Sequence, residues 1–167
     1  VKNITISQFT FSNNFECIRV SNAEAVYVKN VTVSNYVHGI WLYNVNNSLI
    51  WNCIFEGYPL TNFRDFPSLL SPSPADIYVL GSFNNVIANN LIKPGGLGIT
   101  SWGITVVKGE GNNIYANRFI ESIITQVDNI IIVNAPRYGV RLVASDMNKV
   151  FGNNITAGFE GVLLSNI

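Results

Sequence analysis

Three acidic residues of this chain recur at an interval of 18 positions, namely Glu110, Asp128 and Asp146. Two carboxyl groups held about 5 Å apart suit retaining glycoside hydrolysis, and a separation of about 6.5–9.5 Å suits the inverting reaction. The same residues stand near Asn and Gly, and acidic residues in that company are also ordinary turn chemistry. Which of the two applies depends on the elements that hold these side chains.

The composition describes those elements. Among 167 residues, 24 are Asn and 38 are Ile or Val. Ile and Val favour strands, whereas Asn favours turns. This composition therefore predicts many short strands separated by tight corners. Lys and Arg (10) balance Asp and Glu (10), which argues against a nucleic-acid partner, and no apolar run approaches the roughly 20 residues that span a bilayer.

Two short phrases repeat along the chain. The first reads apolar, variable, small or apolar, Asn, variable, apolar. The second reads small, apolar, outward, apolar, and its copies at Ile18 and Ile40, and at Val140 and Val162, lie 22 residues apart. Strong copies of the first phrase begin at Leu49, Val86, Ile114 and Val150, and weaker ones at Ile4, Val31 and Ile130.

A period near 22 with Asn or Gly at fixed corners is typical of a β-solenoid. We therefore expect an all-β fold of about six or seven coils, in which successive coils stack in parallel about 4.8 Å apart. The Asn of the first phrase is expected to form a buried ladder, because its amide both donates and accepts hydrogen bonds. The predicted ladder is Asn52, Asn89, Asn117 and Asn153.

With this pattern the chain resembles the right-handed parallel β-helix proteins that carry Asn ladders. These include carbohydrate-binding and sugar-hydrolase modules, viral tailspikes and archaeal surface proteins. The resemblance covers nearly the whole chain and implies the fold. It does not select a function, because lyases, hydrolases, tailspikes and adhesins share this scaffold.

Two insertions interrupt the period, near residues 57–75 and 93–102. Long loops on a rigid scaffold often carry function. We expect residues 1–167 to form a single β-solenoid segment. Both ends stop within the repeat, so we expect the segment to belong to a longer chain or to be covered by partners.

Aromatic and polar residues are expected on one outward face. The outward position of the second phrase and the position three residues before it place them on neighbouring coils. Flat rings beside hydrogen-bonding groups suit sugar rings or a protein interface, and an insertion covering the face is the alternative. The predicted glycan- or partner-binding residues are Arg19, His38, Trp41, Tyr78, Trp102, Tyr138 and Arg141.

The outward position of the first phrase is expected to be apolar. Such a strip indicates a contact surface, as between the copies of a trimer. The alternative is a register that is wrong by one residue, which would bury the strip. The residues of this strip are Ile50, Ile87, Tyr115, Ile131 and Phe151.

No metal site and no cofactor are expected. His38 is the sole histidine, and Cys17 and Cys53 lie 36 residues apart without a CxxC motif. Two coils of rise exceed the usual Cα separation of a disulfide, so both cysteines are expected to be thiols.

Four sequons are candidates for glycosylation. Together with low charge they indicate an extracellular protein on a cell or virion surface. The function that we expect is a non-enzymatic stalk or adhesin that binds a glycan or a surface protein. It could associate as a homo-trimer or with flanking domains of the same chain. No nucleic-acid partner is expected. The alternative is a polysaccharide lyase or glycoside hydrolase that uses the three acidic residues. The sequon residues are Asn3, Asn30, Asn46 and Asn154.

Overall fold

Short strands joined by tight corners make up most of the described chain. The computed structural model describes residues 1–57, 75–93, 102–120, 125–127, 130–132, 138–156 and 160–165. Within these ranges no helix is long and apolar enough to cross a membrane. The strands are β1 (Lys2–Ser7), β2 (Thr10–Lys29), β3 (Thr32–Asn46), β4 (Leu49–Trp51), β5 (Ile54–Glu56), β6 (Ala75–Leu80), β7 (Val86–Ala88), β8 (Leu91–Lys93), β9 (Trp102–Val107), β10 (Asn113–Tyr115), β11 (Arg118–Phe119), β12 (Thr125–Val127), β13 (Ile130–Ile132), β14 (Tyr138–Val143), β15 (Lys149–Phe151), β16 (Asn154–Ile155) and β17 (Glu160–Ser165).

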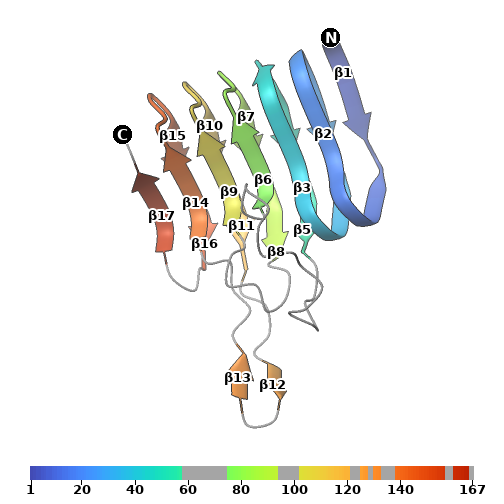
Figure 1. Ribbon diagram of the computed structural model, residues 1–167, viewed down its shortest axis with the longest axis vertical. Coiled ribbons are helices and arrows are strands. Elements are labelled where there is room, and N and C mark those ends of the chain that lie inside the picture. Colours follow the sequence, from blue (N-terminus) through green and yellow to red (C-terminus); the bar gives the residue numbers. More distant parts are fainter. Residues whose placement is uncertain are drawn as a thin grey trace.

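The described strands wind into six stacked coils. Apart from the β12–β13 pair, every strand pair is parallel, as a solenoid requires. Figure 1 shows the coils side by side, with the two termini at opposite ends of the stack. One column of equivalent residues, one from each coil, is Lys2, Glu24, Asn46, Phe83, Glu110 and Asp146.

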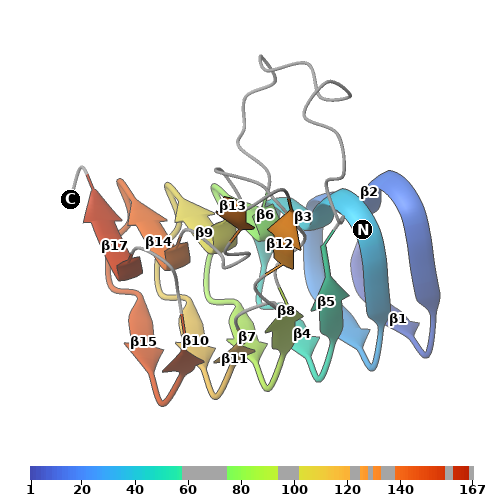
Figure 2. The ribbon, with the colours of Figure 1, turned by 90° about the horizontal axis from the view of Figure 1, so that it is seen from below.

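Two long faces of the solenoid are relevant to function, and Figure 2 shows them as two rows of strands. The first is formed by β2, β3, β6, β9, β14 and β17, and the second by β1, β2, β4, β7, β10 and β15. The long strands β2 and β3 bend around corners. As a result β2 contributes to both long faces, and β3 contributes to the first long face and to the side of the coil that contains β5.

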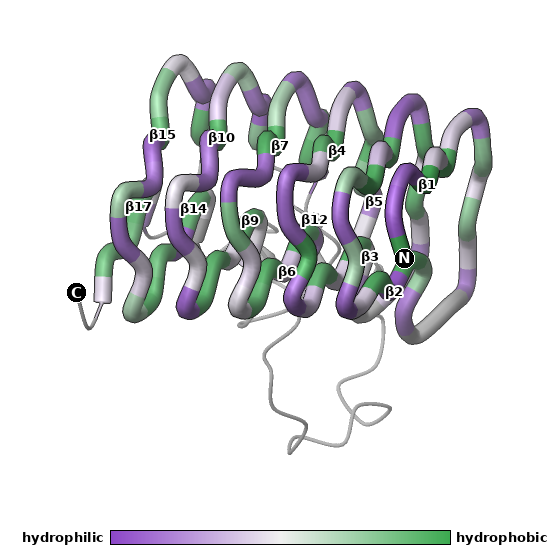
Figure 3. The backbone as a smooth tube through the Cα atoms, turned by 90° about the horizontal axis from the view of Figure 1, so that it is seen from above, coloured by the Kyte–Doolittle hydropathy of each residue, from purple (hydrophilic) through white to green (hydrophobic). Residues whose placement is uncertain are grey.

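Inward-pointing Ile, Val and Leu residues form stacked columns between these faces. Ile40, Ile77, Ile104 and Val140 pair across successive coils, and all four are 0% exposed. The residue that follows each of these along its strand belongs to the outward row, because side chains alternate across a strand. The alternation of hydrophobic and hydrophilic residues around each coil is visible in Figure 3. Burial of these columns supplies the main driving force for folding.

The corners depend on left-handed backbone conformations. All 19 described residues with positive φ (16 non-Gly residues and three Gly) fall into four columns that repeat from coil to coil. Asn occupies many of these positions because it tolerates this conformation better than other non-Gly residues. One such column is Gln8, Asn30, Asn52, Asn89, Ala116 and Gly152.

Ala116 is one of the positive-φ residues that are neither Asn nor Gly, and it tests this account, since its φ is 53°. We expect Ala116→Gly to raise the free energy of unfolding by about 0.5–1 kcal/mol, because Gly adopts this conformation without a Cβ penalty. Gly152→Ala, one coil away in the same column, should lower it by a similar amount. A Cβ at Gly152 would meet nothing within 4 Å, so only its φ of 60° matters there. Urea denaturation of both variants checks the prediction, and shifts of the same sign would contradict it.

Two buried Asn ladders run along the inside of the coils. In each, the Oδ1 of one Asn accepts both the backbone N–H and the side-chain amide of the equivalent Asn one coil earlier. For Asn90 and Asn117 these two bonds are 3.1 and 3.0 Å long. The same amide also donates to a core carbonyl, as Asn117 does to Ile87 at 2.9 Å. The ladders are Asn85, Asn112 and Asn148, and Asn90, Asn117 and Asn153.

The predicted single ladder is therefore corrected. Asn117 and Asn153 belong to a buried ladder, but Asn52 and Asn89 are exposed corner residues with φ of 52° and 55°. The physical reason is that Asn90, the next residue, points inward, while Asn89 turns the chain. Asn52 instead donates to Asn30 at 2.8 Å on the outer surface.

All insertions leave the solenoid at one corner. The coil length grows from 22 residues (Ile18 to Ile40) to 37 (Ile40 to Ile77), 27 (Ile77 to Ile104) and 36 (Ile104 to Val140). The excess lies each time just before β6, β9 or β14. The predicted insertions near 57–75 and 93–102 thus have a third counterpart, between residues 120 and 138, which the sequence analysis did not recognise.

The third insertion contains the short antiparallel pair β12–β13, in which Thr125 faces Ile132. This corrects the assignment of Ile130–Ile132 as a weak copy of the coil repeat. A run of β-branched residues favours a strand but does not say which partner the strand takes. The remaining residues of the three insertions lie outside the described ranges.

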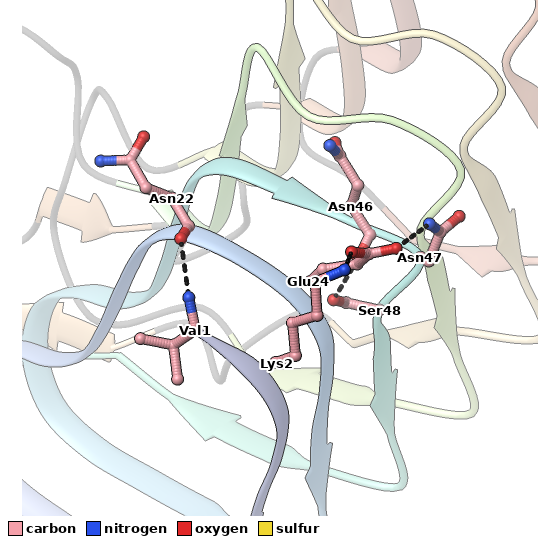
Figure 4. A network of polar contacts seen from close by, with 7 residues as sticks. All are labelled: Val1, Lys2, Asn22, Glu24, Asn46, Asn47 and Ser48. Carbon is pink, nitrogen blue, oxygen red and sulfur yellow. Dashed lines mark hydrogen bonds and ion pairs between the residues drawn. The ribbon is translucent and has the colours of Figure 1, made fainter.

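Polar contacts join the first three coils. The amino group of Val1 donates to the Asn22 carbonyl at 3.3 Å, and Lys2 forms an ion pair with Glu24 at 2.8 Å. Asn47 donates to the same carboxylate at 3.2 Å (Figure 4). The ion pair raises the pKa of Lys2 and lowers that of Glu24. At the other end, Val162 and Leu164 of β17 are 46% and 54% exposed.

Candidate ligand-binding face

The first long face brings together the aromatic and polar residues that the repeat register predicts. Residues at the outward position of the second phrase pair directly from coil to coil, and so do residues three positions earlier. The first row is Arg19, Trp41, Tyr78, Thr105, Arg141 and Leu163, and the second is Glu16, His38, Ala75, Trp102, Tyr138 and Glu160. We call these two rows the aromatic face.

Trp41 lies at the centre of the first half of this face. The guanidinium of Arg19 is 5.0 Å from the centroid of its ring, within cation–π range. The rings of His38 and Tyr78 each lie 5.3 Å from it, the latter edge-on at 69°. Glu16 holds Arg19 by an ion pair at 3.5 Å. These contacts give Trp41 a fixed orientation.

Arg141 organises the second half. Its guanidinium lies 4.0 Å from the centroid of the Trp102 ring. Its charge also reaches Tyr78, two coils away, where burial raises the pKa of the phenol and Arg141 partly offsets this effect. The two halves therefore form one continuous series of rings and cations across five coils.

The aromatic face is less open than the sequence suggests. His38, Tyr78 and Thr105 are buried, with 3%, 8% and 2% of their surface exposed. Trp41, Trp102 and Arg141 are half-buried, and Arg19 is exposed. The side chain of Tyr138 lies outside the described residues. Burial lowers the pKa of His38, with a smaller opposing effect from Glu16, which favours the neutral imidazole.

Several buried polar atoms on this face make no hydrogen bond within the described part of the chain. They include Nε1 of Trp41, Oγ1 of Thr105 and Nε of Arg141. A buried donor or acceptor without a partner costs about 1–3 kcal/mol, and such groups are rare in native proteins. Their presence on one face, among flat rings, is the arrangement expected where a polar ligand or ordered water binds.

A family model confirms the fold that this geometry describes. The model for the right-handed beta helix region matches residues 1–166. The chain belongs to the right-handed β-helix family. The prediction of an all-β right-handed parallel β-helix is thus confirmed. A search of curated proteins finds no match to this β-helix.

Two of the three candidate catalytic carboxylates lie on adjacent coils of the β-helix. Glu110 pairs with Asp146 in a parallel bridge, so the 36 residues between them make one coil rather than two steps of 18. Both side chains are exposed at a corner, five residues beyond the aromatic face. A general acid at neutral pH usually requires burial or a close like charge. Asp128 lies outside the described residues.

The predicted apolar strip, like the predicted Asn ladder, contains both buried residues and residues that point outward. Ile50 and Ile87 are buried in the core, at 1% and 0% exposure, so the register of these two residues was wrong by one. Tyr115 and Phe151 do point outward on the second long face and stack at 5.0 Å. Ile131 lies in β13, away from the coils, and its side chain is not described.

Sequence reasoning missed a buried pair of titratable residues. Tyr36 donates a hydrogen bond to Oδ1 of Asp76, and both side chains are buried. Burial raises the pKa of Asp76 to about 7, although the Tyr36 hydrogen bond acts in the opposite direction. The signal was present, because Asp76 takes the small-residue position that Gly39 and Gly103 fill in the neighbouring coils.

A Cβ at Gly39 would lie 2.5 Å from the Asp76 carbonyl oxygen and 2.9 Å from the Phe55 ring. This close approach explains why Gly recurs in the column, and it shows that the column points into the solenoid. A carboxyl group at this position must therefore be buried.

The remaining candidates have simpler positions. Cys17 and Cys53 are thiols, half-buried and buried respectively. The described residues hold no cluster of metal-ligating side chains. Asn3, Asn30 and Asn154 are exposed, whereas Asn46 is half-buried and its Oδ1 accepts the Phe83 N–H at 2.8 Å.

Proposed function

We propose that this chain is a non-enzymatic β-helix segment of a cell or virion surface that binds a glycan along the aromatic face. The observation that carries the proposal is the continuous series of rings and cations from Arg19 to Arg141. Among the rings, Nε1 of Trp41, Oγ1 of Thr105 and Nε of Arg141 are buried and make no hydrogen bond within the described residues. Sugar rings offer an apolar face for stacking and hydroxyl groups for hydrogen bonds, so they match both properties.

The position of the insertions supports the same face. The chain returns from its three insertions at Ala75, Trp102 and Tyr138, which are consecutive members of the second row of the face. Variable loops that border one part of a rigid scaffold are where binding specificity commonly resides. The return of the chain at these three residues therefore supports recognition on this face.

A surface location is part of the proposal. Three of the four sequon Asn residues are exposed at corners, where a glycan is accommodated without disturbing the core: Asn3, Asn30 and Asn154. Expression in a glycosylating host followed by peptide mass analysis tests this point. We expect occupancy at these three residues to exceed that at Asn46, whose amide group is engaged with Phe83.

Binding is tested with Trp41→Ala on a glycan array. We expect the affinity for the bound glycan to fall by about 30-fold, which corresponds to about 2 kcal/mol for loss of an aromatic anchor. Trp51→Ala is the matched control, because Trp51 is a half-buried outward Trp on the second long face. Thermal melts of both variants show whether the fold is intact.

Equal losses of binding in the two variants, at equal stability, would argue against the aromatic face. Binding to a surface protein but to no glycan would replace the glycan by a protein partner. Turnover of a polysaccharide that disappears in Glu110→Gln or Asp146→Asn would establish the enzymatic alternative instead.

A further inference from the structure

Arg141, on the aromatic face, forms no ion pair with an acidic residue in the described part of the chain. The ion pairs in the described part of the chain are Lys2–Glu24, Arg19–Glu16 and Lys93–Glu56, and Arg141 takes part in none of them. Arg141 is half-buried against Trp102, and its Nε is buried without a hydrogen bond. Arg19, at the other end of the same row, differs because Glu16 already balances its charge.

A buried hydroxyl stands beside this charge. Thr105 pairs with Arg141 on one side and with Tyr78 on the other, so the three residues stand in line on adjacent coils about 4.8 Å apart. Thr105 is 2% exposed, and its Oγ1 has no hydrogen-bond partner among the described residues. Thr105 belongs to the outward row. Among the described residues, the other buried Ser and Thr side chains, those of Ser48, Ser82 and Ser145, each have a hydrogen-bond partner.

The chemistry of these two groups defines the ligand that would satisfy both. A guanidinium has only donors, and a Thr hydroxyl can donate one proton. An oxyanion accepts from both at once, and hydrogen bonds between charged groups are about twice as strong as neutral ones. A neutral sugar hydroxyl could satisfy Thr105 but would leave the charge of Arg141 unbalanced.

We propose that Arg141 and Thr105 form a subsite for an oxyanion, carried as a carboxylate or a sulfate ester by the glycan. The inference rests on the proposed function, because it assigns the charge of the ligand that binds the aromatic face. Trp102 holds the guanidinium in place by stacking, and Tyr78 closes the other side of the subsite.

The test uses matched polysaccharides on three backbones, dextran, cellulose oligosaccharides and galactan, each neutral, carboxymethylated and sulfated. Binding to the whole chain is measured by calorimetry at fixed ionic strength. We expect an acidic form to bind about 10- to 100-fold more tightly than its neutral parent. Whether the carboxymethyl or the sulfate series shows the gain identifies the oxyanion.

Variants separate the subsite from general charge attraction. Arg141→Gln should abolish the preference for the acidic form, and Thr105→Val, which keeps the shape of the side chain, should reduce it. Arg118→Gln is the control, because Arg118 is an exposed Arg outside the aromatic face and its loss should leave the preference unchanged. Melting temperatures confirm that each variant is folded.

One outcome contradicts the subsite but not glycan binding. In it the chain binds glycans and Trp41→Ala weakens that binding, but Arg141→Gln leaves the preference for acidic over neutral polysaccharides unchanged. The subsite is also wrong if Arg118→Gln removes the preference as fully as Arg141→Gln. The proposed function fails together with the subsite if no polysaccharide of the panel binds the wild-type chain.

Discussion

Replacing Asn117 with alanine is expected to lower the free energy of unfolding by about 3–5 kcal/mol, since several buried groups lose their partners together. The Asn117 side chain accepts two bonds from Asn90, at 3.1 and 3.0 Å, and donates to Ile87 at 2.9 Å and to Asn153 at 3.0 Å. Truncation leaves the backbone N–H of Asn90 and the carbonyl of Ile87 unpaired inside the core. For a chain of this size the melting temperature should fall by on the order of 10 °C.

Asn89→Gly provides the control for this loss. It removes an exposed Asn side chain one coil earlier, at a position where φ is 55° and Gly is well tolerated, so stability should hardly change. Asn153→Ala, at a half-buried position of the same ladder, should give an intermediate loss and remains informative if Asn117→Ala does not fold. Similar stability of Asn117→Ala and Asn89→Gly would show that the ladder is not a significant source of stability.

The second large effect is a loss of stability between acid and neutral pH that depends on Asp76. Its pKa is raised from 3.8 to about 7 in the folded state. A raised pKa means that the folded protein binds the proton more tightly than the unfolded chain does. The stabilising contribution is therefore complete below about pH 4, declines as the pH rises to about 7, and is absent above it.

The size of this effect follows from the shift. A rise in the pKa of Asp76 from 3.8 to about 7 corresponds to about 4 kcal/mol. Asp76→Asn should remove the dependence and keep the acceptor for the Tyr36 hydroxyl. The variant is thus expected to be more stable than the wild type above pH 7, and of similar stability near pH 4.

Urea titrations of both proteins from pH 4 to pH 9 measure the difference. Comparing the two proteins cancels the contribution of His38, whose lowered pKa acts in the opposite sense by removing stability as the pH falls. Asp146→Asn, at an exposed corner, is the control and should follow the wild type. Parallel curves for wild type and Asp76→Asn would mean that Asp76 does not titrate in this range.

Both predictions show where reasoning from the sequence succeeded and where it did not. The 22-residue spacing of Ile18 and Ile40, and of Val140 and Val162, predicted the parallel register, and the structure pairs these residues directly. The small, apolar, outward, apolar phrase also placed Trp41, Tyr78 and Arg141 in one row. This worked because a strand has a fixed period of two and each coil must repeat its core.

The errors lie where two residues of the same type are adjacent or where the coil length changes. Asn89 and Asn90 both fit the first phrase, and only the φ of the corner decides which one points inward. Ile87 was placed outside because the copies at Val86 and Ile114 were aligned 28 residues apart, whereas the coil is 27 residues long, as the Ile87–Ile114 pair shows. A one-residue slip exchanges the two sides of a strand.

The sequence by itself thus determined the architecture of this protein: a β-helix of repeated coils, with Ile and Val inside and Asn at the corners. Only the tertiary structure decided which Asn residues are buried, that all three insertions leave one corner, and that Tyr36 and Asp76 form a buried pair. It also placed Thr105 beside Arg141, each with a buried polar atom that makes no hydrogen bond within the described residues. The repeat is a local pattern that burial of the core enforces in every coil. Contacts between coils depend on the exact residue count of each coil, and a pattern that tolerates insertions does not specify that count.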